Sequence, residues 1–342
     1  MEWTRERCPF SERTLRVEQT KYQPVTLQPP PMNTQRFCIA SFYGFSFRIL
    51  IIYWFETKGV QMNNQGKSIL ITGASSGIGL AITTELVKRQ YQVFACARKE
   101  EDLKRLQIEV GAIPVELDVT NEQQVKNLET VLSQKLGSSS LFGLINSAGI
   151  ARHGPVECVP MSVLRKQLEV NFFGLYSVTQ TLLPFLREAR GRIINISSIS
   201  GRISSPFLSP YCASKFAVEA LTDSLRREVD SLGVKVISIC PGFVKTPMLE
   251  KHQDKKELEE LFFTRKGQKE AYCEKLEKFG KHIEEEKKKA GPVEIVVNAV
   301  INGLESPKPR TRYYVGKGIS FVAKLFSLLP DRWLDWIISK HI

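Results

Sequence analysis

Tyr211 and Lys215 lie four residues apart, a spacing that places both side chains on one face of a helix. A free tyrosine titrates near pH ~10 and is a poor acid or base at neutrality. A neighbouring ammonium favours the phenolate and lowers the pKa of the phenol. A phenol tuned in this way could give a proton to a carbonyl oxygen, or take one from an alcohol, while a hydride moves. Ser198, just upstream, could hydrogen-bond the same oxygen. The alternative is an ordinary pair on a helix surface.

A glycine-rich turn separates the apolar run Ser68–Thr72 from a helical pattern that continues to Arg89, and it reads Gly73-Ala74-Ser75-Ser76-Gly77-Ile78-Gly79. The short apolar run is typical of a buried parallel strand. Glycines at such a turn let backbone N–H groups approach a pyrophosphate at the positive end of the helix. In this strand–turn–helix setting the turn predicts a nucleotide site, although many glycine turns bind nothing.

The end of the second strand, Gln92–Ala97, distinguishes the two nicotinamide cofactors. An acidic residue there would hold the ribose hydroxyls of NAD, but Ala97 is followed by Arg98 and Lys99. A cation in place of the acid suits the additional 2′-phosphate of NADP. The alternative is that Arg98 only caps a solvated loop.

Later apolar runs predict further strands, and several are followed by small or polar residues: Ile113–Leu117 with Asp118-Val119, Leu141–Ile145 with Asn146-Ser147-Ala148-Gly149, Ile193–Ile196 with Ser197-Ser198, Lys235–Cys240 with Pro241-Gly242-Phe243-Val244-Lys245-Thr246, and the last strand Arg312–Val315. Asp118 could contact an adenine or cap the helix that starts at Asn121. Met161–Leu186 reads as one long helix that carries Asn171. The alternation predicts a single α/β domain, with a parallel sheet covered by helices on both faces.

Composition bounds the class of protein. The chain has 342 residues and a formal net charge of +12, which could suit an anionic cofactor, an anionic membrane or nucleic acid. The positive charge is scattered and no zinc-finger or RNP-type motif is present, so we expect no nucleic-acid partner. The seven cysteines are far apart and form no Cys-x-x-Cys pair, which favours reduced thiols in a cytosol-facing protein and no metal site.

Three further segments surround or interrupt the predicted catalytic domain, residues 62–316. Residues 1–61 read as an extension, disordered apart from the apolar segment 37–55, which could be a membrane anchor, a segment packed on the domain or sequence upstream of the natural start. Residues 247–291 read as a charged helical lid over the substrate. Residues 317–342 read as an amphipathic tail that could contact a membrane surface, the substrate mouth or another subunit.

In their order and spacing these residues resemble the short-chain dehydrogenase/reductase family over about Lys67 to Val315. The matching pieces are the glycine-rich turn with Thr72, Asn146-x-Ala148-Gly149, Asn171, Ser198, Tyr211-x-x-x-Lys215, and Pro241-Gly242 with Thr246. Each motif is weak, but the ordered set is specific. The resemblance implies a Rossmann-type, doubly wound fold with a seven-stranded parallel sheet. The N-terminal extension and the C-terminal apolar helices lie outside the part of the chain that it covers.

The resemblance also implies a catalytic tetrad. Tyr211 would be the acid/base and Ser198 would orient and polarise the substrate oxygen. Ser198 is chosen over Ser197 because its distance to Tyr211 matches the family's. Lys215 would lower the pKa of the tyrosine and hold the nicotinamide ribose, and Asn171 would keep a water in the proton relay.

The implied cofactor is NADP(H), with NAD(H) as the weaker alternative. Its implied contacts are Gly73, Ser75, Ser76, Gly77, Ile78, Gly79, Arg98, Asp118, Val119, Asn146, Ala148, Gly149, Tyr211, Lys215, Pro241, Gly242, Val244 and Thr246. Among them, Asp118 and Val119 would flank the adenine, Asn146 the cofactor ribose and Thr246 the carboxamide. Ser147 replaces the more usual second asparagine of Asn-Asn-Ala-Gly.

A closer resemblance is to the retinol and hydroxysteroid dehydrogenase branch. It rests on the stretches Tyr211–Ala220, Asp223–Glu228 and Arg310–Tyr313. It implies an alcohol or carbonyl on a lipophilic substrate such as a steroid or retinoid. Separately from this resemblance, we expect a homo-oligomer and a cytoplasmic location, with any membrane association through residues 37–55 or the tail. The alternatives are a 3-oxoacyl thioester reductase and, in another class, a non-catalytic NADP-sensing or scaffold protein.

Overall fold

The computed structural model describes residue 64 and residues 66–137, 139–250 and 263–340. The chain divides into two units, Met1–Val60 and Gln61–Ile342, and all the described residues belong to the second. The apolar segment 37–55 lies outside the described residues, as does part of the expected lid, residues 251–262.

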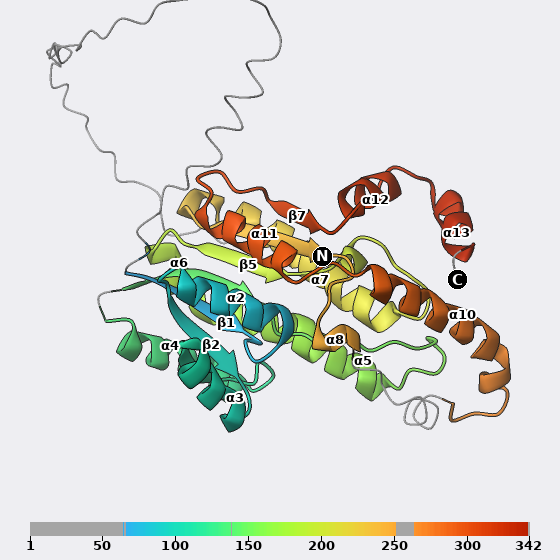
Figure 1. The fold of residues 1–342 in the computed structure, drawn as a ribbon, viewed down its shortest axis with the longest axis horizontal. Coiled ribbons are helices and arrows are strands. Elements are labelled where there is room, and N and C mark those ends of the chain that lie inside the picture. Colours follow the sequence, from blue (N-terminus) through green and yellow to red (C-terminus); the bar gives the residue numbers. More distant parts are fainter. Residues whose placement is uncertain (1–63, 65, 138, 251–262, 341–342) are drawn as a thin grey trace, which may run out of the picture. The chain divides into compact units, whose positions relative to one another are not determined.

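The centre of the second unit is a seven-stranded parallel sheet in the order β3-β2-β1-β4-β5-β6-β7 (Figure 1). The strands are β1 Lys67–Thr72, β2 Gln92–Ala97, β3 Ile113–Glu116, β4 Ser140–Asn146, β5 Arg192–Ile196, β6 Lys235–Pro241 and β7 Arg312–Val315. The strand order reverses between β1 and β4, and in such sheets ligands bind beyond the carboxyl ends of the strands at this switch point. The predicted parallel sheet is confirmed.

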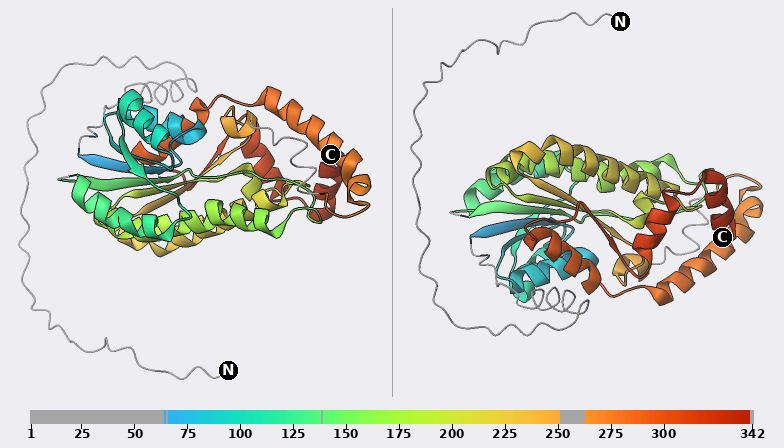
Figure 2. Two further views of the ribbon diagram at one scale, coloured as in Figure 1. Left: turned by 90° about the horizontal axis from the view of Figure 1, so that it is seen from below. Right: turned by 90° about the horizontal axis from the view of Figure 1, so that it is seen from above.

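Helices cover both faces of the sheet (Figure 2). The main ones are α2 Gly77–Lys88, α3 Glu100–Arg105, α4 Glu122–Lys135, α5 Met161–Leu168, α6 Gly174–Glu188, α7 Ser209–Glu228 and α11 Glu294–Glu305. Helices α2, α3 and α11 pack on one face, around Ile71, Leu86 and Val300. Helices α4, α6 and α7 pack on the other, around Leu70 and Val178. Adjacent strand residues therefore feed two separate cores, as expected for a sheet buried on both sides.

The helix expected over Met161–Leu186 is interrupted. A π-helical turn, η2 Glu169–Phe173, separates α5 from α6. Single π turns inside α-helices are rare and are frequent at functional sites. Here the turn contains the buried Asn171, so the prediction of one continuous helix needs this correction.

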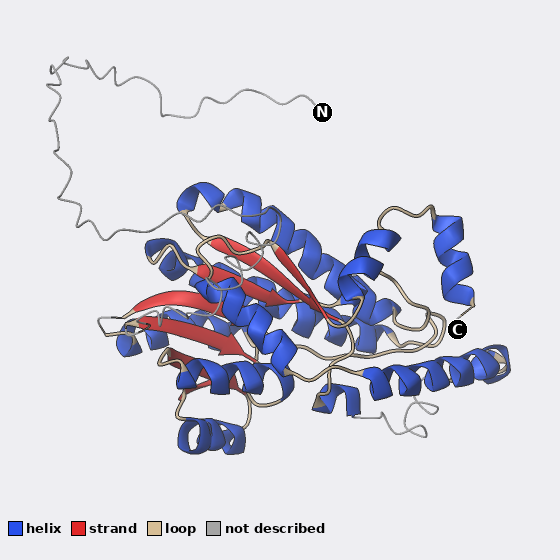
Figure 3. Cartoon of the chain, turned by 45° about the horizontal axis from the view of Figure 1, so that its top comes forward, coloured by secondary structure: helices blue, strands red, loops and turns tan. Residues whose placement is uncertain are grey.

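Helices also lie after the last two strands (Figure 3). Helix α8 Pro247–Glu250 and the long helix α10 Gln268–Lys289 follow β6 and lie beyond the carboxyl ends of the strands. The short helices α12 Ile319–Phe326 and α13 Asp331–Ser339 follow β7. Within the described part of the chain, no helix is both long and apolar enough to cross a membrane.

Candidate active site

Tyr211 and Lys215 project from the first turns of α7, where both approach the end of β5. The Lys215 Nζ atom donates a hydrogen bond to the Ile196 carbonyl oxygen at 2.8 Å and lies 5.8 Å from the centroid of the Tyr211 ring. Lys215 is 6 % exposed, whereas the Tyr211 side chain is only partly buried. The structure therefore brings the predicted pair together at the carboxyl end of the sheet.

Burial dominates the electrostatics of this pair. Burial raises the pKa of the Tyr211 phenol, and a hydrogen bond with Ser198 opposes that rise. Burial also lowers the pKa of Lys215 to about 8, although the Glu219 carboxylate raises it. The expected lowering of the tyrosine pKa by Lys215 is not what this arrangement shows, because desolvation of the phenol outweighs the other effects.

Ser198 reaches Tyr211 because a short 3₁₀ turn, η3 Ile199–Gly201, packs against α7. The Ser198 Oγ atom accepts a hydrogen bond from the Ser200 N–H at 3.1 Å and caps that turn. A Cβ atom at Gly201 would lie 2.9 Å from the Lys215 carbonyl oxygen, so only glycine permits this approach. The sequence analysis did not single out Gly201, since its contact depends on tertiary packing.

Asn171 holds the loop that follows β4. Its Oδ1 atom accepts from the Ile150 N–H at 2.8 Å, and its Nδ2 atom donates to the Ile150 carbonyl at 2.9 Å and to Ser214 Oγ at 3.0 Å. A Cβ atom at Gly149 would lie 3.4 Å from Asn171 Oδ1 and 4.0 Å from Lys215 Nζ. All members of the predicted tetrad therefore converge on one place.

The glycine-rich turn fits close backbone approach. Gly73 has φ +67°, and a Cβ atom there would lie 2.7 Å from Ala148 Cα. A Cβ atom at Gly79 would lie 2.2 Å from the Gly73 carbonyl oxygen. Thr72 fixes the neighbouring strand end, because its Oγ1 atom accepts from the N–H groups of Ser147 and Ala148, both at 3.1 Å. A side chain at either position would clash with this backbone, so the tight turn requires glycine there.

Ser75, Ser76 and Ile78 belong to the same turn. Ser76 is the N-cap residue of α2, and no side-chain bond from it caps the helix. The Ser75 carbonyl accepts a hydrogen bond from Arg105 Nη2, which also pairs with Asp102 at 2.9 Å. Arg105 therefore fixes the turn from α3. The sequence does not reveal this role, because the spacing of residues in α3 does not indicate which of them contacts the turn after β1.

Arg98 is exposed at the end of β2, and its guanidinium lies 3.9 Å from the Asp118 carboxylate. Burial raises the pKa of Asp118, but hydrogen bonds from Thr120 and the charge of Arg98 outweigh it and lower that pKa. Asp118 does not cap α4; Asn121 does, accepting from Gln123 N–H at 3.0 Å and Gln124 N–H at 3.1 Å. Val119 is buried beside Asp118.

Asn146 points inward. Its Nδ2 atom donates to Thr179 Oγ1 at 3.0 Å and to Asn195 Oδ1 at 2.9 Å, and its own Oδ1 atom is buried with no hydrogen-bond partner. The side chain thus ties β4 to β5 and α6.

The segment after β6 completes the rim. The Thr246 side chain lies 3.5 Å from the Cβ position of Gly77, so this loop closes over the glycine-rich turn. The buried Val244 forms a bridge with Gly291. Pro241 ends β6, and a Cβ atom at Gly242 would meet Ile319 of α12 at 2.6 Å.

These residues fit a nicotinamide dinucleotide. The two tight glycines leave a backbone cradle beside the N-terminus of α2, and Arg98 supplies a cation at the end of β2. Lys215, Asn171 and Thr246 lie near the same carboxyl end of the sheet, so the residues of this chain alone can hold the cofactor.

An aromatic wall forms around Phe207, which lies four residues before Tyr211 in the chain. Phe279 of α10 is 5 % exposed, and its ring centroid lies 5.4 Å from that of Phe207 and 6.1 Å from that of His153. Phe207 has φ +64°, a left-handed conformation that is strained for an aromatic residue and that clusters at functional sites. Tyr272 donates to Glu157 at 3.0 Å, which fastens α10 to the loop after β4.

The sequence profile of the family described as short chain dehydrogenase matches residues 67–257. The chain belongs to the short-chain dehydrogenase family. It is an oxidoreductase of the NAD(P)-dependent type that acts on CH–OH groups. The glycine-rich turn and the predicted tetrad positions all lie within the matched residues.

Curated relatives cover most of the chain. Human retinol dehydrogenase 16 is 34 % identical over 88 % of this chain and 95 % of that protein. The NADPH-dependent 3-dehydrocapnine reductase of Ornithobacterium rhinotracheale is 35 % identical over 80 % and 96 %. The 17-beta-hydroxysteroid dehydrogenase type 6 of Bos taurus is 32 % identical over 85 % and 93 %. The short-chain dehydrogenase is thus similar to retinol and steroid dehydrogenases.

Among solved structures, a short chain dehydrogenase of Burkholderia cenocepacia in complex with NADP superposes with a TM-score of 0.60 and 26 % identity, covering 79 % of this chain and 96 % of that one. The likeness confirms the Rossmann-type fold of the family.

Proposed function

We propose that this enzyme uses NADP(H) to interconvert an alcohol and a carbonyl on a lipophilic molecule such as a steroid, a retinoid or a related lipid. The observation that supports it most directly is the convergence of Tyr211, Ser198 and Lys215 at the start of α7. The loop that leads into this helix carries Phe207, which packs against Phe279 of α10. A proton donor and an apolar surface then share one site.

In the reducing direction, the Tyr211 hydroxyl gives its proton to the carbonyl oxygen, and Ser198 donates a hydrogen bond to the same oxygen. Bound NADPH supplies the hydride. Lys215 places a cation beside the phenol and stabilises the phenolate that remains. Asn171, already bonded to the Ile150 backbone, positions the loop beside Lys215 and holds a water that returns the proton. In the oxidising direction Tyr211 takes the proton.

The preference for NADP(H) over NAD(H) rests on Arg98. Its guanidinium is 63 % exposed and sits at the end of β2, where a 2′-phosphate would lie, while Asp118 at 3.9 Å is its present partner. The guanidinium fork suits a phosphate better than a single distant carboxylate.

The substrate class rests on the lid. The inward face of α10 carries Tyr272, Leu276, Phe279 and Ile283 at helical spacing, and its outer face is charged. The named relatives act on retinol, hydroxysteroids and 3-dehydrocapnine. An apolar inner face of this kind would exclude water from a bulky apolar substrate. The site would then bind such a substrate more tightly than a small polar one.

We further propose a cytosol-facing homo-oligomer with membrane contact through the tail. Exposed aromatic residues lie on η2, α6 and α7, namely Phe173, Tyr176 and Phe216, and they suit a subunit interface. Phe321, Trp333 and Trp336 are exposed on α12 and α13, beside Lys324 and Lys340, and they suit a membrane surface.

The first test is oxidation of NADPH and of NADH by the purified protein with steroid, retinoid, 3-oxoacyl thioester and small carbonyl compounds. The proposal expects turnover of a bulky ketone or aldehyde, with NADPH preferred. Preference for a 3-oxoacyl thioester would replace the substrate class by the alternative. Tight NADPH binding with no turnover would favour a sensing role.

The acid/base role of Tyr211 gives a sharper prediction. Tyr211→Phe removes the hydroxyl that carries the proton, so kcat should fall by about 10²-fold or more, while the Kd for NADPH, followed by fluorescence titration, should change little. Tyr176→Phe, on the exposed face of α6, is the matched control and should keep wild-type kcat. Turnover that survives in Tyr211→Phe would refute the mechanism.

A further inference from the structure

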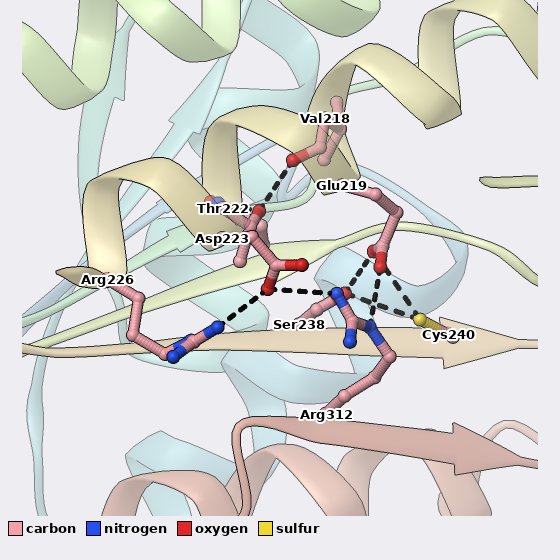
Figure 4. Close-up of polar contacts among 9 residues, drawn as sticks. Val218, Glu219, Thr222, Asp223, Arg226, Ser238, Cys240 and Arg312 are labelled. Atoms are coloured by element: carbon pink, nitrogen blue, oxygen red, sulfur yellow. Dashed lines mark hydrogen bonds and ion pairs between the residues drawn. The ribbon is translucent and has the colours of Figure 1, made fainter. Parts of the chain in front are cut away.

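A cluster of charged side chains lies behind the catalytic face of α7, one turn beyond Lys215 (Figure 4). Glu219 and Asp223 extend from α7, and Arg312 reaches them from β7. The Arg312 Nε atom lies 2.6 Å from Glu219 Oε2, and its Nη2 atom lies 3.1 Å from Asp223 Oδ1. Arg226 holds the same Asp223 oxygen at 3.0 Å.

Glu219 is the buried member of this cluster. The residue is 3 % exposed, and its Oε1 atom accepts hydrogen bonds from Ser238 Oγ and, at 3.5 Å, from Cys240 Sγ of β6. Burial and the Glu219 carboxylate raise the pKa of the Cys240 thiol to about 12, so the thiol keeps its proton and can donate it to Glu219. Both carboxylate oxygens are therefore engaged, one by β6 and one by Arg312.

The position of Glu219 relates the cluster to the site. Lys215 and Glu219 are four residues apart on one helix, so they share the buried face of α7. Lys215 also faces the Ile196 carbonyl of β5, Tyr211 of its own helix and Cys240 of β6. Of these neighbours, Glu219 is the one that carries a carboxylate. Arg312, its ion-pair partner, is the cation that offsets the negative charge of Glu219.

We propose that Glu219 is a positioning residue for the proton transfer, whose charge, moderated by Arg312, keeps the buried Lys215 ammonium protonated. This role rests on the proposed function of Lys215. Without Glu219 the ammonium would stay desolvated with no opposite charge, and it would lose its proton at lower pH. Without Arg312 the full carboxylate would act on Lys215, which would keep its proton to higher pH. The two partners of one ion pair thus have opposite effects.

The test compares Glu219→Gln with Arg312→Gln in the full-length protein. Titration of the ¹³Cε resonance of Lys215, assigned by its loss in Lys215→Met, should have its midpoint lowered by about one pH unit in Glu219→Gln and raised in Arg312→Gln. The alkaline limb of kcat for carbonyl reduction with NADPH should move in the same two directions. A purely structural ion pair would lower stability in both variants and leave both midpoints in place.

Asp223→Asn is the matched control, because Asp223 binds Arg312 from the same helix but lies a further turn from Lys215. Its midpoint should stay close to that of the wild type. If Glu219→Gln fails to fold with Arg312 unpaired, the double variant Glu219→Gln/Arg312→Gln removes both charges and should still lower the midpoint. Unchanged midpoints in these variants, or shifted midpoints with an unmoved kcat limb, would overturn the role of Glu219. The NMR titration needs no substrate, so a wild type without turnover would count against the proposed function alone.

Discussion

Tyr211 and Lys215 occupy a desolvated part of the site, and burial disfavours the charged form of each. It therefore raises the pKa of the Tyr211 phenol and lowers the pKa of the Lys215 ammonium. The sequence predicts that these residue types share a helix face, because four-residue spacing is visible in it. It does not predict that Lys215 would bond the Ile196 carbonyl, or that Glu219 would face a residue of β7. Those contacts depend on how distant strands pair.

The buried lysine has a consequence for stability. The pKa of Lys215 is about 8 in the folded protein against 10.5 unperturbed, so the unfolded chain binds its proton more tightly. The contribution of Lys215 to the free energy of unfolding is therefore fully present above pH ~10.5, and it is lost as the pH falls through about 8. Relative to Lys215→Met, the wild type should gain up to roughly 3 kcal/mol in free energy of unfolding over that window. Urea denaturation of both proteins at several pH values measures this gain, and a constant difference would contradict it.

Arg98 gives the second prediction at this scale. Arg98→Ala should raise the KM for NADPH by about 10- to 100-fold, the loss of a charge-assisted phosphate contact, and should leave the KM for NADH nearly unchanged. Lys99→Ala, whose ammonium pairs with Glu101 at 3.0 Å, is the neighbouring control. Equal effects of Arg98→Ala on both cofactors would show that Arg98 does not read the phosphate.

At the scale of elements, short irregular turns place the catalytic side chains. The turn η2 puts Asn171 against Ile150, and η3 brings Ser198 to α7 through Gly201. Hydrophobic periodicity predicts the strands and the existence of the helices here. It cannot predict a π turn, because an added residue in one turn changes little in the pattern of apolar positions.

Helix α10 gives the prediction for elements. Phe279→Ala should remove the wall against Phe207 and reduce kcat/KM for bulky apolar substrates about tenfold or more, while the Kd for NADPH stays the same. Lys278→Ala, on the exposed face of the same helix, should change neither. Replacement of the lid by a short loop should likewise reduce kcat/KM for bulky apolar substrates and leave the Kd for NADPH unchanged. Unchanged substrate preference in these lid variants would remove α10 from the substrate site.

At the scale of the whole molecule, exposed apolar side chains concentrate in the segment from α12 to α13. Leu328, between the two helices, is 82 % exposed, and no residue of α13 is buried. The sequence predicts an amphipathic tail from its aromatic and basic residues. It leaves open what covers that tail, because a membrane, a second subunit and the substrate mouth all favour the same residue types.

Vesicle flotation separates these possibilities. The double variant Trp333→Ala/Trp336→Ala should weaken binding of the full-length protein to phosphatidylserine-containing vesicles about tenfold or more, since each indole loses its apolar contact with the interface. Ile108→Ala, an equally exposed apolar change on η1 Leu106–Val110, is the control. Binding that is the same in all three proteins would assign the tail to another surface.

The pairing of Arg312 with Glu219 also bears on how the protein is made. Helix α7 and its carboxylate leave the ribosome long before β7 does, so the buried charge of Glu219 has no counterpart until the last strand is synthesised. A chain that stops short of Arg312 would bury an uncompensated carboxylate beside β6, at a cost of several kcal/mol. Termination before Arg312 would then yield a product that cannot reach the native state, and cellular proteolysis would clear it.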